Sequence, residues 1–127
     1  MADMALAMVI DDSSATRMIL ARILGELGYT VEKAENGADA LHKLSKMSRP
    51  ELILIDWNMP VMNGYEFLVK ARSMPEYDNV TMMMVTTETE IEQVLKALEA
   101  GANEYVMKPF TKDIIDEKLS LLGLGAR

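Results

Sequence analysis

Five short apolar runs, separated by longer stretches with helical periodicity, constrain the fold of this 127-residue chain more than any other feature. Runs such as LILI at 52–55 and MMMV at 82–85 are apolar on both faces, as expected for strands that helices cover on each side. The five runs lie at 6–10, 29–31, 52–55, 80–85 and 104–106. Strands that alternate with helices predict parallel pairing and right-handed crossovers. We therefore expect an α/β fold: a (βα)5, doubly wound, five-stranded parallel sheet in a flavodoxin-like three-layer sandwich.

The stretches between the runs carry helix signals. The clearest apolar stripe consists of Ile91, Val94, Leu95 and Leu98, and we expect the polar side chains between them to face away from the core. Helix N-caps are expected where an Asn or Thr stands three residues before an acidic residue, at Asn36, Asn63 and Thr89. Gly28 and Gly101 stand where helices are expected to stop.

Composition excludes several classes of function. The absence of cysteine rules out disulfides, thiol catalysis and cysteine-ligated metals. A formal charge of -7 disfavours binding to nucleic acid, which depends on neutralising phosphates. No apolar run approaches the ~20 residues that span a bilayer, and the first residues lack a secretory pattern. We expect one cytoplasmic domain over 1–127, with its core at about 5–122, no output domain, and neither nucleic acid nor membrane as a partner.

Polar residues follow the apolar runs at the points where the strands should end. Asp11 and Asp12 follow the first run, Asp56 the third, Thr86 the fourth and Lys108 the fifth. Ligands of open α/β sheets bind at this carboxyl edge, near the point where the strand order reverses. We therefore expect three carboxylates, a hydroxyl and an ammonium group to share one cleft.

This set of groups predicts a magnesium site and phosphoryl chemistry. Three close carboxylates repel one another unless a cation joins them, and ligands that offer only oxygen suit a hard ion such as Mg²⁺. With that charge balanced, Asp56 can act as the nucleophile towards a phosphoryl group, while Lys108 and Thr86 contact its oxygens. The alternative is that Asp11 and Asp12 merely cap the first helix, although a cap needs only one acid.

Four ordered motifs resemble the receiver domain of bacterial response regulators, and most of all the single-domain chemotaxis regulators. They are IDD at 10–12, IDWNMPVMNG at 55–64, VTTE at 85–88 and YVMKPF at 105–110, and the resemblance runs from about residue 6 to residue 122. It implies that Asp56 accepts a phosphoryl group from a phosphohistidine of a histidine kinase. It also implies that Asp12 binds Mg²⁺ directly, Asp11 largely through water, and Asn58 through its backbone carbonyl. Lys108 would pair with the phosphoryl group, next to a cis Lys108–Pro109 bond.

The resemblance further implies a switch and a set of partners. Thr86 would move towards the phosphoryl group and Tyr105 into the space behind it, which would remodel the face formed by the fourth helix, fifth strand and fifth helix. That face would bind a downstream protein, such as the flagellar motor switch. Asn58, Thr87 and Glu88 would set the rate of self-catalysed dephosphorylation, and a phosphatase could act as well. The protein would be a monomer and no enzyme beyond this chemistry on itself.

Some positions depart from the chemotaxis pattern. Thr87 replaces a small residue at the entrance for the phosphoryl group, and Ser13 replaces a bulkier neighbour of the acid pair. The expected output face carries three acids, Glu92, Glu99 and Glu104. The alternative function is therefore that of a stand-alone phosphorelay or phosphate-sink receiver in a pathway other than chemotaxis.

Two other classes of protein fit less well. A haloacid dehalogenase-type phosphatase also uses an aspartate at a strand end, but it needs a second acid two positions later, where this chain has Asn58. A flavodoxin-like carrier needs a loop rich in glycine and hydroxyl groups after the first strand, where this chain has two acids. Among single residues, we expect Trp57 to be partly exposed, His42 to be solvated and the methionines to fill the core.

Overall fold

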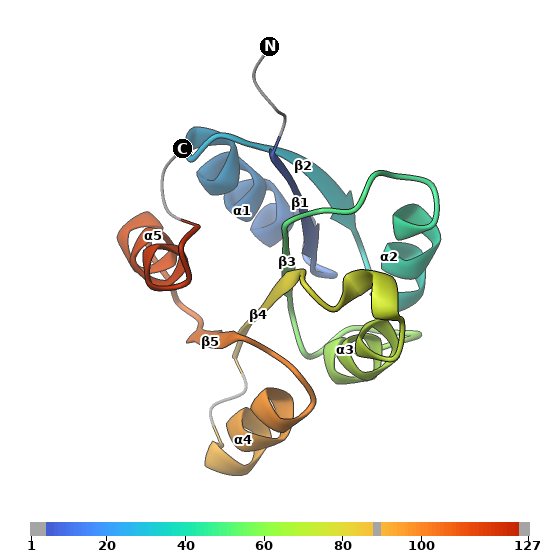
Figure 1. Ribbon diagram of the computed structural model, residues 1–127. Helices are drawn as coiled ribbons and strands as arrows, with labels where there is room; N and C mark the ends of the chain where they lie inside the picture. Colours follow the sequence, from blue (N-terminus) through green and yellow to red (C-terminus); the bar gives the residue numbers. More distant parts are fainter. Residues whose placement is uncertain (1–4, 88–89, 125–127) are drawn as a thin grey trace.

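The structure is a computed structural model that describes residues 5–87 and 90–124 (Figure 1). Its five strands are β1 (Ala5–Ile10), β2 (Tyr29–Ala34), β3 (Leu52–Ile55), β4 (Thr81–Thr86) and β5 (Glu104–Met107). Its α-helices are α1 (Ser14–Glu26), α2 (Gly37–Leu44), α3 (Gly64–Arg72), α4 (Ile91–Glu99) and α5 (Lys112–Leu121), and a 3-10 turn covers Pro75–Tyr77.

The strands form one parallel sheet in the order β2-β1-β3-β4-β5, which confirms the doubly wound topology. The helices α1 and α5 cover one face, and α2, α3 and α4 cover the other (Figure 1). The strand β2 is three residues longer than predicted, because Glu32 and Lys33, which are exposed at the sheet edge, break the apolar run before the strand ends. The order reverses beside β1, so the site is expected between β1 and β3.

Each face of the sheet has its own core. Leu20, Ile23 and Leu24 of α1 pack with Ile115 and Leu119 of α5 on one side. Phe67, Leu68 and Ala71 of α3 and the small Ala97 of α4 pack on the other. Met82, Met83 and Met84 are fully buried, which confirms that this methionine run fills the core.

Helix ends follow the predicted caps. The side chain of Asn36 accepts a hydrogen bond from the Asp39 amide at 2.8 Å, and Asn63 and Glu66 form a reciprocal capping box. Gly28 and Gly101 follow helix ends at φ of 102° and 115°, where a side chain would be strained. The N-cap of α4 is Glu90, whereas Thr89 lies outside the described residues.

The orientation of α4 differs from the prediction. Ile91, Leu95 and Leu98 are 67%, 51% and 41% exposed, and only Ala97 is buried. Helical periodicity identifies an apolar face but does not fix which side of the helix lies on the sheet. Here the small Ala97 lies against the sheet, and the larger side chains beside it remain in solvent. The prediction that this stripe would enter the core was therefore wrong for these three residues.

Within the described ranges, no helix is both long and apolar enough to cross a membrane.

Candidate functional site

The backbone fixes Asp11 and Asp56 side by side at the carboxyl edge of the sheet. Ile10 pairs with Ile55 in the parallel register of β1 and β3, and each aspartate follows one residue later. The Asp56 amide donates to the Ile10 carbonyl at 2.9 Å, and the Asp11 amide donates to the Ala34 carbonyl at 3.1 Å. Both side chains therefore start from backbone that is already held by the sheet.

Asp12 joins these two residues in an acidic cluster. One carboxylate oxygen of each of Asp11, Asp12 and Asp56 lies within 4.8 Å of the others. Asp11 and Asp56 are 1% and 6% exposed, and Asp12 is open to solvent. Three converging oxygen ligands with one open side suit Mg²⁺, which keeps several waters when it binds. The predicted meeting of the three carboxylates is thus confirmed.

Lys108 provides the positive charge inside the cleft. Its Nζ lies 2.8 Å from Oδ2 of Asp11 and 3.7 Å from Oδ1 of Asp56. Its backbone amide donates to the Thr86 carbonyl at 2.9 Å, and the Lys108–Pro109 bond is cis, as the resemblance implied. The ammonium group therefore already bridges the two buried carboxylates.

The pKa of Asp56 is raised above its usual value. Burial is the main cause, and the negative charge of Asp11 adds to it. Three contacts act in the opposite direction: the Lys108 charge, a hydrogen bond from the Thr86 hydroxyl, and a hydrogen bond from the Trp57 amide. Desolvation thus makes the negative charge of Asp56 costly, and a cation beside it relieves that cost.

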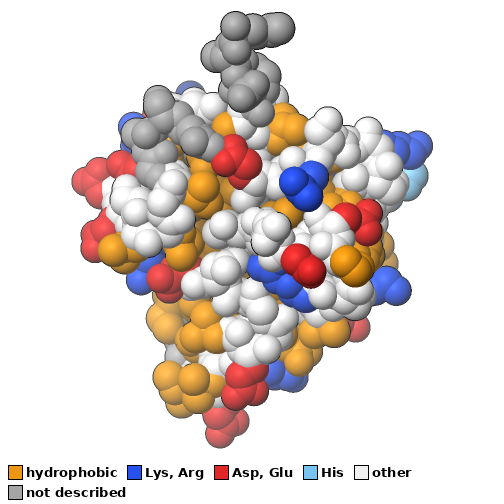
Figure 2. Space-filling view, viewed as in Figure 1, with side chains coloured by type: hydrophobic (Ala, Val, Ile, Leu, Met, Phe, Trp, Pro, Cys, Tyr) orange, Lys and Arg blue, Asp and Glu red, His pale blue; other side chains and the backbone are white. Residues whose placement is uncertain are grey.

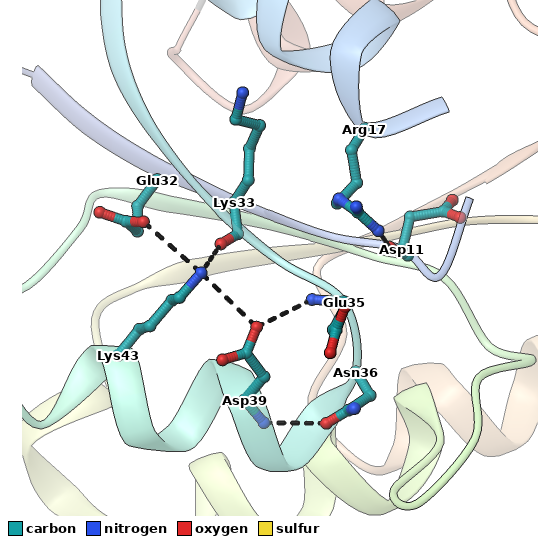
Figure 3. Close-up of polar contacts among 8 residues, drawn as sticks. All are labelled: Asp11, Arg17, Glu32, Lys33, Glu35, Asn36, Asp39 and Lys43. Atoms are coloured by element: carbon teal, nitrogen blue, oxygen red, sulfur yellow. Dashed lines mark hydrogen bonds and ion pairs between the residues drawn. The ribbon is translucent and has the colours of Figure 1, made fainter. Parts of the chain in front are cut away.

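Ser13 and Arg17 contribute to the site through contacts that the sequence did not predict. Ser13 is the N-cap of α1, since its side chain accepts from the Thr16 amide, so neither Asp11 nor Asp12 has that role. The Ser13 amide instead donates to Oδ1 of Asp11 at 2.9 Å. Arg17 reaches back from α1 and donates to the Asp11 carbonyl at 2.6 Å (Figure 3). The position of Ser13 directly before a predicted helix could have identified it as the N-cap.

The chain turns sharply after Asp56. The Gly64 amide donates to the Trp57 carbonyl at 2.9 Å, and a Cβ on Gly64 would lie 2.0 Å from the Asp56 carbonyl oxygen. Only glycine allows α3 to begin this close to the site. Trp57 is 8% exposed and stacks on Tyr65, so the prediction that it would be partly exposed was wrong. Tyr65 covers the ring, and this contact was not visible in the sequence.

The two predicted switch residues lie on neighbouring strands. Thr86 is the last residue of β4 and is fully buried, and it pairs with Met107 of β5. Tyr105 is 8% exposed and belongs to the same core cluster as Trp57. Tyr105 pairs with Met84, two residues before Thr86 on β4. The Thr86 hydroxyl, which contributes a hydrogen bond to Asp56, therefore lies near the aromatic ring of Tyr105 on the next strand.

The residues predicted to tune dephosphorylation are only partly described. Asn58 and Thr87 follow β3 and β4 and are both exposed at the carboxyl edge, whereas Glu88 lies outside the described residues. His42 is exposed near the end of α2, as predicted for a solvated histidine.

Comparisons with known proteins agree with this geometry. The model of the response regulator receiver domain matches residues 7–120. A chemotaxis protein CheY homolog of Campylobacter jejuni is 42% identical over 121 residues, which cover 94% of this chain and 93% of that protein. Chemotaxis protein CheY1 of Helicobacter pylori is 40% identical over 116 residues, covering 91% and 94%. The structure of Vibrio cholerae chemotaxis protein CheY4 superposes with a TM-score of 0.87 at 35% identity, covering 94% of this chain and 98% of that one.

Proposed function

Because this chain belongs to the response regulator receiver family and is a phosphorylation-dependent switch of two-component signalling, we propose that Asp56 is its phosphoacceptor. The observation that carries this assignment is the place of Asp56 at the end of β3, inside the acidic cluster and 3.7 Å from the ammonium of Lys108. Asp12 is exposed, and Asp11 already holds Lys108 at 2.8 Å. Asp56 is therefore the carboxylate best placed to attack.

The acidic cluster would hold the metal ion. Asp12 and Asp56 would bind Mg²⁺ directly, Asp11 largely through water, and Asn58 through its backbone carbonyl. Bound there, Mg²⁺ supplies positive charge against the oxygens of the transferred group. The donor set supports this assignment because it consists of oxygen ligands with an exposed side at Asp12.

The transfer itself requires little more than positioning. A carboxylate oxygen of Asp56 forms a bond to the phosphorus atom while the bond from phosphorus to the donor's imidazole nitrogen breaks, and the electron pair leaves with the imidazole. Lys108 and the Thr86 hydroxyl, which now contact Asp56, would then contact phosphoryl oxygens. The charged groups are fixed before the reaction, so little reorganisation is needed.

Phosphorylation would be transmitted through Thr86 and Tyr105. Movement of the Thr86 hydroxyl towards a phosphoryl oxygen changes the space around the aromatic ring on β5, and the populations of two surface states shift accordingly. The face of α4, β5 and α5 would then bind a downstream protein. Its exposed apolar side chains support this role; they are Ile91, Leu95, Leu98, Met107, Ile114 and Leu121. In Figure 2 apolar side chains gather at the lower left, over α4 and towards α5.

We assign the output to chemotaxis, with the flagellar motor switch as the target, because the relatives of similar length carry chemotaxis names. Glu92 and Glu99 make the α4 helix acidic beside its apolar side chains. This charge favours a second candidate function, that of a phosphorelay or phosphate-sink receiver. Asn58, Thr87 and Glu88 would set the lifetime of the phosphoryl group, with or without a separate phosphatase.

The test is phosphate incorporation from acetyl phosphate with Mg²⁺, followed by intact mass spectrometry. We expect one phosphoryl group on the wild type and none on Asp56→Asn, while His42→Asn, a surface substitution, remains fully competent. Incorporation that persists in Asp56→Asn would overturn the assignment. Mg²⁺ alone should change the fluorescence of Trp57, and a flat titration would contradict the metal site.

A further inference from the structure

Three side chains form a continuous stack between the phosphorylation site and α4. The ring of Trp57, the residue after Asp56, stacks on Tyr65 of α3 with centroids 5.4 Å apart and planes 17° apart. Nζ of Lys96, on α4, lies 4.4 Å from the centroid of the Tyr65 ring. An ammonium group at this distance is attracted to the negative face of the ring. The stack therefore joins the segment after β3 to α3 and α4.

The inner end of the stack lies next to Asp56 in the chain. Trp57 directly follows Asp56, whose own amide donates to the Ile10 carbonyl at 2.9 Å. The Trp57 carbonyl accepts from the amide of Gly64, which directly precedes Tyr65. A new group on the Asp56 carboxylate therefore lies directly beside the residue whose ring supports Tyr65.

The outer end of the stack reaches a helix that few large side chains anchor. Ala97 is the buried residue of α4, and most of its larger apolar side chains are exposed. A groove of about 460 Å³ separates α3 from α4, and Tyr65 and Lys96 are among the residues that line it. At the far end of α4, Arg72 donates to the Gly101 carbonyl at 3.0 Å. The Tyr65–Lys96 contact thus supports the body of the helix, while Arg72 fixes the turn after it.

We propose that Trp57, Tyr65 and Lys96 couple the Asp56 site to α4 by a route separate from Thr86 and Tyr105. The proposal rests on the proposed function, since it assumes that Asp56 is phosphorylated. Such coupling is reciprocal, so a protein that binds α4 also changes the equilibrium at Asp56. Tyr65 and Lys96 are positioning residues in this account, because neither contacts the carboxylates.

The experiment measures hydrogen exchange of residues 90–99, with and without acetyl phosphate and Mg²⁺. Tyr65→Leu and Lys96→Gln each break the contact, whereas Tyr65→Phe and Lys96→Arg keep a ring and a cation. We expect either disruptive variant to speed exchange in α4 about two- to fivefold in the unphosphorylated protein, as expected for loss of one exposed cation–ring contact. We also expect the change on phosphorylation to shrink by a similar factor. The conservative variants should behave as the wild type.

Two controls make the result decisive. Lys70→Gln removes an exposed lysine of α3, whereas the cation over the Tyr65 ring is Lys96, so it should leave α4 unchanged. The double variant Tyr65→Leu/Lys96→Gln should exchange no faster than either single variant, because both remove one contact. Additive effects, or a full phosphorylation response in Tyr65→Leu, would overturn the coupling. Intact mass reports phosphate separately, so a wild type that incorporates none would instead contradict the proposed function.

Discussion

Gly64 should tolerate no side chain, because α3 begins directly against the phosphoacceptor. A Cβ built there lies 2.0 Å from the Asp56 carbonyl oxygen and 2.9 Å from Cγ2 of Ile55. A relaxed carbon–oxygen contact is about 3.3 Å, so the start of α3 would have to retreat by about 1.3 Å. That movement would break the hydrogen bond from the Gly64 amide to the Trp57 carbonyl, now 2.9 Å long.

The expected cost of Gly64→Ala follows from these two effects. Overpacking costs about 1–3 kcal/mol, and loss of one hydrogen bond costs about 0.5–1.5 kcal/mol. We therefore expect the free energy of unfolding to fall by about 2–4 kcal/mol, a large part of the ~5–15 kcal/mol of a typical domain. The melting temperature should drop by roughly 10 °C.

Gly25→Ala is the matched control. Gly25 lies in α1, and a Cβ there meets nothing within 4 Å. Alanine should stabilise this helix by up to about 0.5–1 kcal/mol, because it restricts the unfolded chain more than glycine does. Urea unfolding, followed by circular dichroism and by Trp57 fluorescence, measures both variants. A Gly64→Ala protein with the wild-type midpoint would refute the account of the close approach, as would equal losses in both variants.

Three other perturbations test the electrostatics and the packing. Burial, and then the Asp11 charge, raise the pKa of Asp56, so ionising this carboxylate costs folding free energy. In Mg²⁺-free buffer Asp56→Asn should therefore be more stable than the wild type at pH 7. A difference between their urea midpoints that is larger in acid than at pH 7 would contradict this sign. Mg²⁺ should raise the melting temperature of the wild type but barely that of Asp12→Ala, and equal thermal shifts would argue against Asp12 as a ligand. Arg72→Met should lower the free energy of unfolding by about 2–4 kcal/mol in urea, since the guanidinium donates to the carbonyls of Tyr77, Val80 and Gly101. A loss no larger than that of the exposed control Arg22→Met would contradict this role.

The site was predictable because topology, not side-chain detail, brings its residues together. Two-sided apolar runs marked the strands, and the rule that ligands bind at the carboxyl edge selected Asp11, Asp56, Thr86 and Lys108. Register then places Asp11 beside Asp56, which requires only that β1 and β3 be parallel neighbours. The caps at Asn36 and Asn63 were equally local, since each asparagine side chain accepts from the backbone amide three residues later.

The features that the sequence did not predict depend on two things: the orientation of each helix about its own axis, and the conformations of the long side chains. The apolar stripe of α4 was recognised, yet a helix seated on Ala97 leaves Ile91 and Leu95 exposed. Trp57 is buried because Tyr65, eight residues later, covers its ring. The contact of Arg17 with the Asp11 carbonyl likewise needs a side-chain conformation that periodicity cannot supply.

The central claim, that Asp56 carries the phosphoryl group, is tested most directly by locating the modified residue. The protein is phosphorylated with acetyl phosphate and Mg²⁺, reduced with borohydride, which converts an aspartyl phosphate to homoserine, and mapped by peptide mass spectrometry. The account predicts homoserine in place of Asp56 and unmodified Asp11 and Asp12. A reduced product at Asp11 or Asp12, with Asp56 intact, would contradict it.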